Sequence, residues 1–265
     1  MRVKERTDLI LNTEIHQMIL DVRKAIVIAI LFFPVMHLPL LGQVIIAPAS
    51  GYIELVNRAF GQDQELVNGR QYYNRHPSSM GHPYLLQGWA HQGSVTLRGK
   101  IYTNIWLKYD IEAQQIEVEY QTMNGGDNQV VLVNDRVDEF YIENYYFRRM
   151  NLEPELSRIQ FYQVLGGGPM IWYIRWEKKL VPVSGDSRFV EEYSKSKRHF
   201  LVELEGNVYP VHSEKSFVKL FPKEIQKSMK RLIRSNHLQI RSDSVEQLEL
   251  FIQAAIKLMT EGGAE

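Results

Sequence analysis

Three histidines fall close together in the stretch YYNRHPSSMGHPYLLQGWAHQG: His76, His82 and His91. Histidine is a common metal ligand and titrates near neutral pH, so this group raises the hypothesis of a metal site or a ligand pocket. The spacings of six and nine residues match no zinc motif, and the sequence contains no HExxH. The three are therefore weak candidates for a metal site, and no cofactor is expected. The alternative is a Pro/Gly-rich loop with its histidines at the surface.

Residues for hydrolysis are sparse. The sequence contains no G-x-S-x-G motif. Ser78 and Ser79 lie near His76 in the sequence, which is weak support for a catalytic triad. Asp135 and Asp138 have the chemistry of a glycosidase carboxylate pair, but they fall at a predicted turn and strand edge, where solvated acids are usual. The catalytic residues, if there are any, stay unknown from the sequence.

Aromatic side chains recur along the predicted strands. They could form a binding face for a sugar or a peptide, or they could fill the core of a sheet. We favour the core. On that interpretation Trp106 is mostly buried, and Trp106→Ala costs about 3–5 kcal/mol of stability. The residues concerned are Tyr102, Trp106, Tyr109, Tyr120, Trp172, Tyr173 and Trp176.

Positive charge is most concentrated near the C-terminus, where residues 215–241 hold eight lysines and arginines against one acid, Glu224. A helix over 222–235 would place its apolar residues on one stripe and leave five basic residues largely off it. We hypothesise that this basic face docks on an acidic partner; the alternative is a surface that serves solubility alone. The stripe comprises Ile225, Met229, Leu232 and Ile233, and the basic face comprises Lys223, Lys227, Lys230, Arg231 and Arg234.

The segments that must position these residues have the pattern of β-strands up to residue 212. Alternating apolar and polar runs, separated by turn residues, are typical of an antiparallel meander. The sequence predicts about ten to twelve strands that curl into a sandwich or an open barrel. Gly166–Pro169 is expected to be a turn and not a phosphate-binding loop, because no helix follows it. Turns are predicted at Arg98-Gly99, Glu112–Gln114, Asn124–Asp127, Asn134-Asp135, Gly166–Pro169 and Gly206-Asn207.

From Ser213 the apolar period changes from two residues to about 3.6, which indicates helices. SEKSFVKLF predicts a short helix, and Pro222 suits the first turn of the next one. A further helix opens with Ser244 and Gln247 at capping-box spacing. The fold class is therefore mainly β, with two or three C-terminal helices. The buried face of the last helix is predicted to comprise Val245, Leu248, Ile252, Ala255, Ile256 and Met259.

The apolar run Ala25–Met36 follows Arg23 and Lys24 and has the length of a signal-peptide core, whereas a membrane span needs about 20 apolar residues. We predict a signal peptide over 1–42, cleaved between Gly42 and Gln43. An uncleaved anchor and a buried core helix are the alternatives. The stretch before Arg23 is long for such a peptide, so residues 1–17 are predicted to be an over-extended start, with Met18 the natural one.

The domains expected are a signal peptide (1–42), an antiparallel β domain (43–212) and a helical segment packed on it (213–265). The chain has no cysteine, which excludes disulfides and a thiol nucleophile. Its formal net charge is zero, which argues against a nucleic-acid partner. After cleavage, the protein is not expected to be an integral membrane protein. Its partner is expected to be an envelope component: a protein, a glycan or an anionic lipid surface.

Three longer stretches carry a resemblance: VNGRQYY, GHPYLLQGWAHQGSVTLRGKIYTNIWLKYDIEAQQIEV and GNVYPVHSEKSFVKLF. In this order they resemble a family of uncharacterised exported β-rich proteins from Gram-negative bacteria. The resemblance spans most of the chain after residue 42, but its motifs are turn and strand residues. It implies export and a β-rich fold. It implies no activity, cofactor or catalytic residue, because none is known for that family.

These observations predict a non-catalytic periplasmic or envelope-associated protein that binds or scaffolds a partner. The alternative is an exported hydrolase acting on glycans or peptides. The two hypotheses differ in what they require of the histidines. If His76, His82 and His91 project into one pocket with an acid, the hydrolase gains support.

Overall fold

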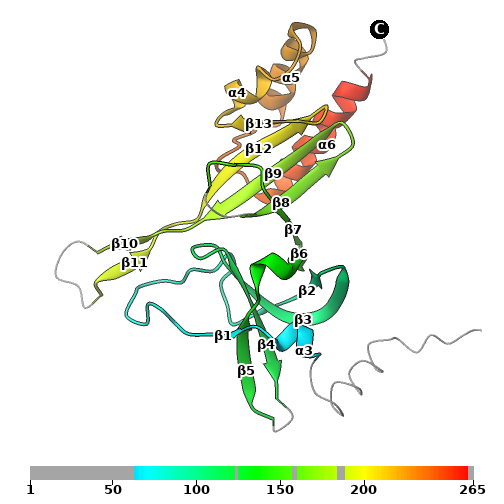
Figure 1. The fold of residues 1–265 in the computed structure, drawn as a ribbon. Helices are drawn as coiled ribbons and strands as arrows, with labels where there is room; N and C mark the ends of the chain where they lie inside the picture. The colour runs from blue at the N-terminus through cyan, green and yellow to red at the C-terminus, as the bar shows by residue number, and fades with distance from the viewer. Residues whose placement is uncertain (1–62, 123–124, 157–159, 184–188, 262–265) are drawn as a thin grey trace, which may run out of the picture. The chain divides into compact units, whose positions relative to one another are not determined.

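The computed structural model describes residues 63–122, 125–156, 160–183 and 189–261. The predicted signal peptide, 1–42, and the proposed start at Met18 lie outside the described residues. The described chain is mainly β, as the sequence predicts, and three of its helices, α4 to α6, follow the last strand, whereas the short helix α3 precedes the first (Figure 1). In chain order the elements are α3 (Gln64–Val67), β1 (Arg70–Gln71), β2 (His91–Leu97), β3 (Lys100–Asp110), β4 (Gln115–Gln121), β5 (Asp127–Val131), the 3₁₀ turn η1 (Asn134–Arg136), β6 (Val137–Ile142), β7 (Tyr145–Met150), β8 (Gln160–Gly167), β9 (Met170–Glu177), β10 (Leu180–Pro182), β11 (Glu191–Tyr193), β12 (Lys197–Leu204), β13 (Asn207–Val211), α4 (Glu214–Val218), α5 (Lys223–Ser235) and α6 (Val245–Glu261).

Eleven of the strands form one open antiparallel sheet in the order β1-β5-β4-β3-β2-β6-β7-β8-β9-β12-β13. Most neighbours in the sheet are also neighbours in the chain, which is the meander that the turn spacing predicts. β10 and β11 form a separate two-stranded hairpin between β9 and β12. That hairpin is not predicted from the sequence, because its strands are only three residues long and show no clear alternation.

The turn predicted at Arg98-Gly99 lies where the sequence places it, and the one predicted at Gly206-Asn207 lies one residue earlier, at Glu205-Gly206. Asn124 of the predicted Asn124–Asp127 turn lies outside the described residues. Arg98 and Gly99 connect β2 to β3 with positive φ angles of 50° and 81°. Glu205 and Gly206 do the same between β12 and β13, with φ angles of 52° and 79°. Positive φ is free for glycine and costly for most other residues, so the glycine in each pair marks the turn in the sequence.

The three C-terminal helices also follow the sequence prediction. The hydroxyl of Ser213 accepts from the backbone N–H of Ser216 and caps α4. Ser244 and Gln247 form the predicted reciprocal capping bonds at the start of α6, at 3.0 and 3.3 Å. These bonds satisfy N–H groups that have no partner inside the helix. α4 and α6 therefore begin at positions that the sequence specifies locally, whereas α5 begins directly after Pro222, with no side-chain cap.

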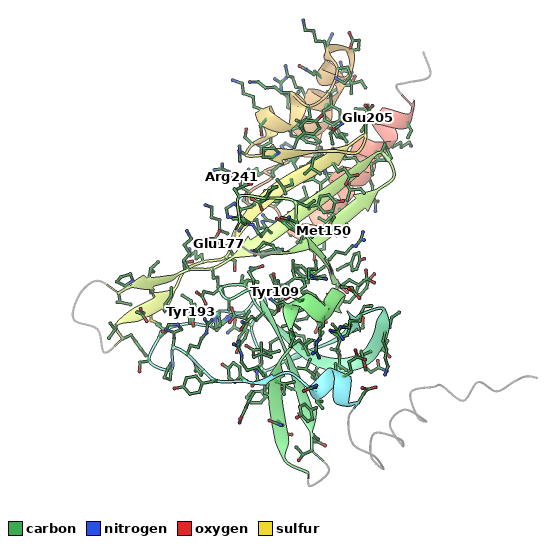
Figure 2. The ribbon with its side chains drawn as sticks, in the orientation of Figure 1. Tyr109, Met150, Glu177, Tyr193, Glu205 and Arg241 are labelled. Carbon is green, nitrogen blue, oxygen red and sulfur yellow. The ribbon has the colours of Figure 1, made fainter. Side chains whose placement is uncertain are left out.

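One hydrophobic core lies under β2 to β8. Tyr109, labelled in Figure 2, lies at its centre. The centroid of its ring is 5.1 Å from that of Phe140, 5.0 Å from that of Phe147 and 6.0 Å from that of Phe161. Phe140 and Phe147 stack on one another at 4.7 Å. Each of these rings lies at a position of its strand that faces the same side of the sheet. Burying each ring stabilises the fold by about 2–3 kcal/mol.

A second core lies between the helices and the strands from β8 to β13. Trp172 is fully buried and packs against Phe200 and Phe217. The stripe Ile225, Met229, Leu232 and Ile233 and the predicted inner face of α6 both belong to this core. Figure 1 shows α6 alongside β8, where the two elements touch. The amphipathic pattern therefore predicted correctly which helix faces are covered.

Candidate functional site

The basic face of α5 is intact on the surface. Lys223, Lys227, Lys230, Arg231 and Arg234 are all exposed, and Met229 behind them is fully buried. At about 100° per residue the five cations occupy an arc of about 100°, and the apolar stripe lies on the opposite side. Because the stripe packs against the second core, the helix cannot rotate to hide its charges.

This face is also electrostatically unbalanced. Among the described residues, no carboxylate lies within ion-pair distance of any of its five cations. The one acid on α5, Glu224, lies in the first turn, where it complements the helix dipole. Lys215 on neighbouring α4 and Lys219, directly after that helix, are exposed and add to the positive field. The surface therefore presents charge that no partner within the described chain neutralises.

The three histidines have separate partners. His76 lies 3.4 Å from a carboxylate oxygen of Glu191, and His91 lies 3.1 Å from one of Glu143. His82 stacks on Tyr84, and burial and the nearby Lys178 ammonium lower its pKa. No group of three histidines and acids suited to a metal occurs within the described ranges. The structure thus does not bring the weak metal candidates into one site.

The other hydrolysis candidates are also apart. Asp138 accepts a hydrogen bond of 2.8 Å from the backbone N–H of Gly99 and so fastens the β2–β3 turn. Asp135 is exposed in η1. The backbone N–H of Ser79 donates to the carbonyl of His76, which makes a local turn. Asp138 and the backbone of Ser79 therefore take part in local turns, and Asp135 lies at the surface.

The prediction for the aromatic residues is right for three members and wrong for one. Tyr109, Trp172 and Tyr173 are buried. Trp106 is 49% exposed, although it was expected in the core. The physical reason is strand parity: the inward positions on β3 are Leu107 and Tyr109, so Trp106 points to the opposite face. Tyr102, Tyr120 and Trp176 are half-buried at the edges of the cores.

That opposite face of β3 and β4 holds two buried acids that the sequence analysis did not single out. Asp110 and Glu117 are 6% and 2% exposed. Glu117 accepts hydrogen bonds from the hydroxyl of Tyr84 at 3.1 Å and from the amide of Gln129 at 2.5 Å. Burial raises the pKa of Asp110 to about 6, and burial together with the Asp110 charge raises the pKa of Glu117 to about 7.

Residues 72–90, which we call the covering segment, bury these acids. The segment runs along β3, with backbone hydrogen bonds from Leu85 to the Tyr109 carbonyl and from Ile111 to the Pro83 carbonyl. Lys178 ties it down further by donating to the carbonyls of His82 and Tyr84 at 2.8 and 2.9 Å. The alternation of polar and apolar residues along β3 and β4 would place Asp110 and Glu117 on a solvent-exposed face of the sheet. No local sequence pattern shows that an irregular segment covers that face.

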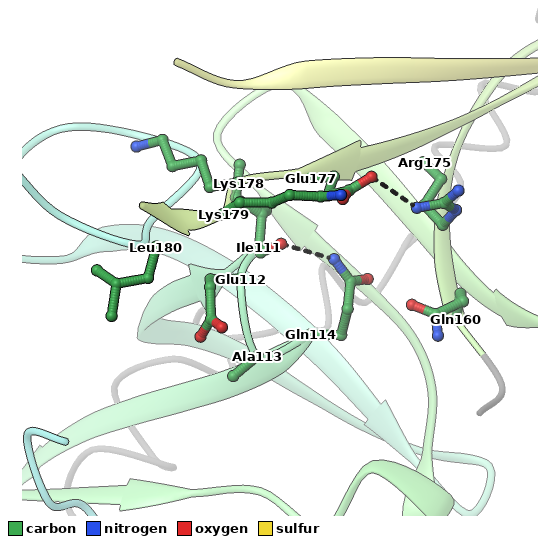
Figure 3. A pocket seen from close by; sticks show the side chains of 10 residues that line it. All are labelled: Ile111, Glu112, Ala113, Gln114, Gln160, Arg175, Glu177, Lys178, Lys179 and Leu180. Atoms are coloured by element: carbon green, nitrogen blue, oxygen red, sulfur yellow. Dashed lines mark hydrogen bonds and ion pairs between the residues drawn. The ribbon is translucent and has the colours of Figure 1, made fainter. Parts of the chain in front are cut away.

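A cavity of about 520 Å³ opens beside the turn between β3 and β4 (Figure 3). Its wall includes Gln114, Arg175 and Glu177. The polar groups of these three side chains form hydrogen bonds or ion pairs with one another or with neighbouring residues. Arg175 binds both carboxylate oxygens of Glu153 and also lies 3.4 Å from Glu177. The amide of Gln114 donates to the carbonyls of Ile111 and Trp176. The wall is a satisfied network that joins two parts of the sheet.

No protein-family model, curated protein or solved structure matches the chain. In the part of the chain that the structure describes, the helices are too short or too polar to span a lipid bilayer. The basic face of α5 is the strongest candidate for a functional site, because its cations are both predicted from the sequence to lie on one side of a helix and found exposed there.

Proposed function

We propose that the protein is a non-catalytic, exported binding or scaffolding protein of the cell envelope that docks on an anionic lipid surface through α5. The observation that supports this most is the set of five exposed cations, with no ion-pair partner among the described residues, on one side of a helix whose other side packs in the core. Export itself rests on the predicted signal peptide. The intact mass of protein recovered from the envelope fraction tests it, with 43–265 expected and the full-length chain as the contrary result.

A lipid surface fits this face better than a protein pocket does. Lys223, Lys227, Lys230 and Arg234 extend along about 17 Å of helix at 1.5 Å per residue. A planar array of headgroups can meet such a row of charges along its whole length. Each basic residue near an anionic membrane contributes about 1 kcal/mol, and the attraction falls off within a Debye length.

The hydrolase alternative requires the three histidines and an acid to project into one pocket, and they do not. His76, His82 and His91 contact different elements, and none of them lines the cavity beside the β3–β4 turn. The binding function needs no such convergence, since long-range charge is enough to hold the protein at a surface.

Vesicle sedimentation of the protein without its first 42 residues tests the docking. We expect binding to vesicles containing phosphatidylglycerol at about 50 mM salt, weaker binding at about 300 mM salt, and no binding to phosphatidylcholine vesicles. Changing the five cations of α5 to Gln is expected to weaken binding more than about tenfold. Glutamine keeps good helix propensity, so the fold is expected to survive.

A matched control removes the same charge elsewhere. It changes five other exposed cations to Gln: Arg70, Arg98, Arg148, Lys195 and Lys197. This control is expected to retain most of the binding. If the α5 variant binds as strongly as the parent at both salt concentrations, the basic face serves only solubility. If both variants lose binding equally, overall charge and not α5 is responsible.

A further inference from the structure

Two tryptophans on one face of the sheet are open to solvent. Trp89, near the end of the covering segment, is 73% exposed, and Trp106 on β3 is 49% exposed. Indole is the largest apolar side chain, and proteins usually bury most of it. Trp172, by contrast, is fully buried in the same protein. The exposure of the first two is therefore a local feature of this face.

The ring of Trp89 contacts a charged neighbour, and Trp106 lies in register with another. Lys108, two residues after Trp106 and on the same face, places its ammonium 4.5 Å from the centre of the Trp89 ring. That ammonium also pairs with Glu119 at 2.7 Å. Glu119 lies directly across from Trp106 in the β3–β4 register. Lys108 and Glu119 together carry no net charge, and both are mostly buried.

Hydrogen-bonding side chains continue this row across the sheet. Gln92 on β2 lies across from Trp106 on one side, and Gln129 on β5 lies across from Glu119 on the other. The arrangement thus offers flat apolar rings bordered by amide and carboxylate groups on the same face.

We propose that this face, defined by Trp89, Trp106, Lys108 and Glu119, is a binding site for a neutral glycan. A pyranose ring in a β-linked chain has a flat face of C–H groups that stacks on indole, and equatorial hydroxyls that both donate and accept hydrogen bonds. The polar border matches those hydroxyls, and the neutral Lys108–Glu119 pair matches an uncharged ligand. A wholly apolar partner would bury the polar border unpaired, which is costly.

The glycan site goes beyond the proposed lipid docking and is tested separately. The probes are cellohexaose and chitohexaose, titrated to millimolar concentration against the protein, with tryptophan fluorescence and isothermal calorimetry as readouts. We expect at least one of the two sugars to shift the emission and to bind with a measurable heat. No lipid is present, so the result is independent of the vesicle experiment.

The variants identify the rings that bind. Trp89→Ala and Trp106→Ala are each expected to weaken binding at least tenfold. Both side chains are exposed, so the variants are expected to fold, which circular dichroism checks. Tyr209→Ala, which removes an exposed aromatic ring from β13, is the control and is expected to bind like the parent. If neither sugar binds, if both tryptophan variants bind like the parent, or if a proline-rich peptide binds here in place of the sugars, the proposal is wrong.

Discussion

Glu117 is a carboxylate in a place where a negative charge is costly. It is almost fully buried, its nearest donors are neutral, and Asp110 adds a repulsive charge. Burial and that charge together raise its pKa to about 7. In the unfolded chain an ordinary glutamate has a pKa of about 4.3. Between those two values the folded state holds a proton that the unfolded state has released.

This difference makes stability depend on pH. Because the folded state binds more protons between about pH 4.3 and about 7, the free energy of unfolding falls as pH rises through that window. Glu117→Gln keeps an acceptor for Tyr84 and Gln129 without the charge. We expect the stability advantage of the variant over the parent to be larger at pH 8 than at pH 5, by on the order of 1–3 kcal/mol.

Urea denaturation of both proteins at pH 5 and pH 8 measures this difference. Glu249→Gln, which removes an exposed carboxylate from α6, is the matched control and is expected to leave the pH dependence unchanged. Equal pH slopes for the parent and Glu117→Gln would mean that Glu117 is not the group whose protonation changes on folding.

At the scale of the elements, local signals predicted most of the fold. The turn at Arg98-Gly99 and the cap at Ser244 are set by residues within four positions of one another, so the sequence shows them directly. The covering segment depends on contacts between distant residues, such as Lys178 with the carbonyl of His82, and has no periodicity to read. The burial of Glu117 and the exposure of Trp89 follow from that segment, so both were missed.

The error on Trp106 has a different cause. Apolar residues occur on both faces of β3, and an aromatic residue in a strand is more often buried than exposed. Only the observed register shows that Leu107 and Tyr109, and not Trp106, face the first core. The composition of the segment predicts that a strand exists. Which of its two faces is buried depends on how the neighbouring strands pair with it.

The end of β8, next to its turn into β9, shows how tightly α6 fits the sheet. Gly166 has a positive φ of 81°, and a Cβ added there would lie 2.8 Å from both the Met170 carbonyl and a methyl carbon of Ile252 on α6. Gly167, the next residue, has open space around the same position. We expect Gly166→Ala to cost about 2–4 kcal/mol, because it adds backbone strain to overpacking.

Gly167→Ala supplies the comparison at the next position of β8 and is expected to change stability by less than about 1 kcal/mol. Urea denaturation measures both variants. Equal stability of the two would contradict the close approach of α6 to this end of β8.

At the scale of the whole molecule, a single sheet joins two cores. The first core lies under β2 to β8, and the second lies beneath the helices. Tyr145 and Trp176 pack against both, and the Arg175–Glu153 pair adds a buried polar link nearby. The described residues, from 63 to 261 with their gaps, all belong to one compact unit. A continuous hydrogen-bonded sheet with shared side chains favours one cooperative unfolding transition over two.

A defect in one core should therefore destabilise the other. Phe140→Ala removes a ring from the centre of the first core and is expected to cost about 3–5 kcal/mol. Trp172 reports on the second core, and it can be followed alone after Trp89, Trp106 and Trp176 are changed to Phe. In that background we expect Phe140→Ala to lower the urea midpoint of Trp172 fluorescence and of far-ultraviolet circular dichroism by the same amount. A Trp172 transition that stays in place while the circular dichroism signal splits would mean that the helices and the strands β8 to β13 unfold independently of the rest.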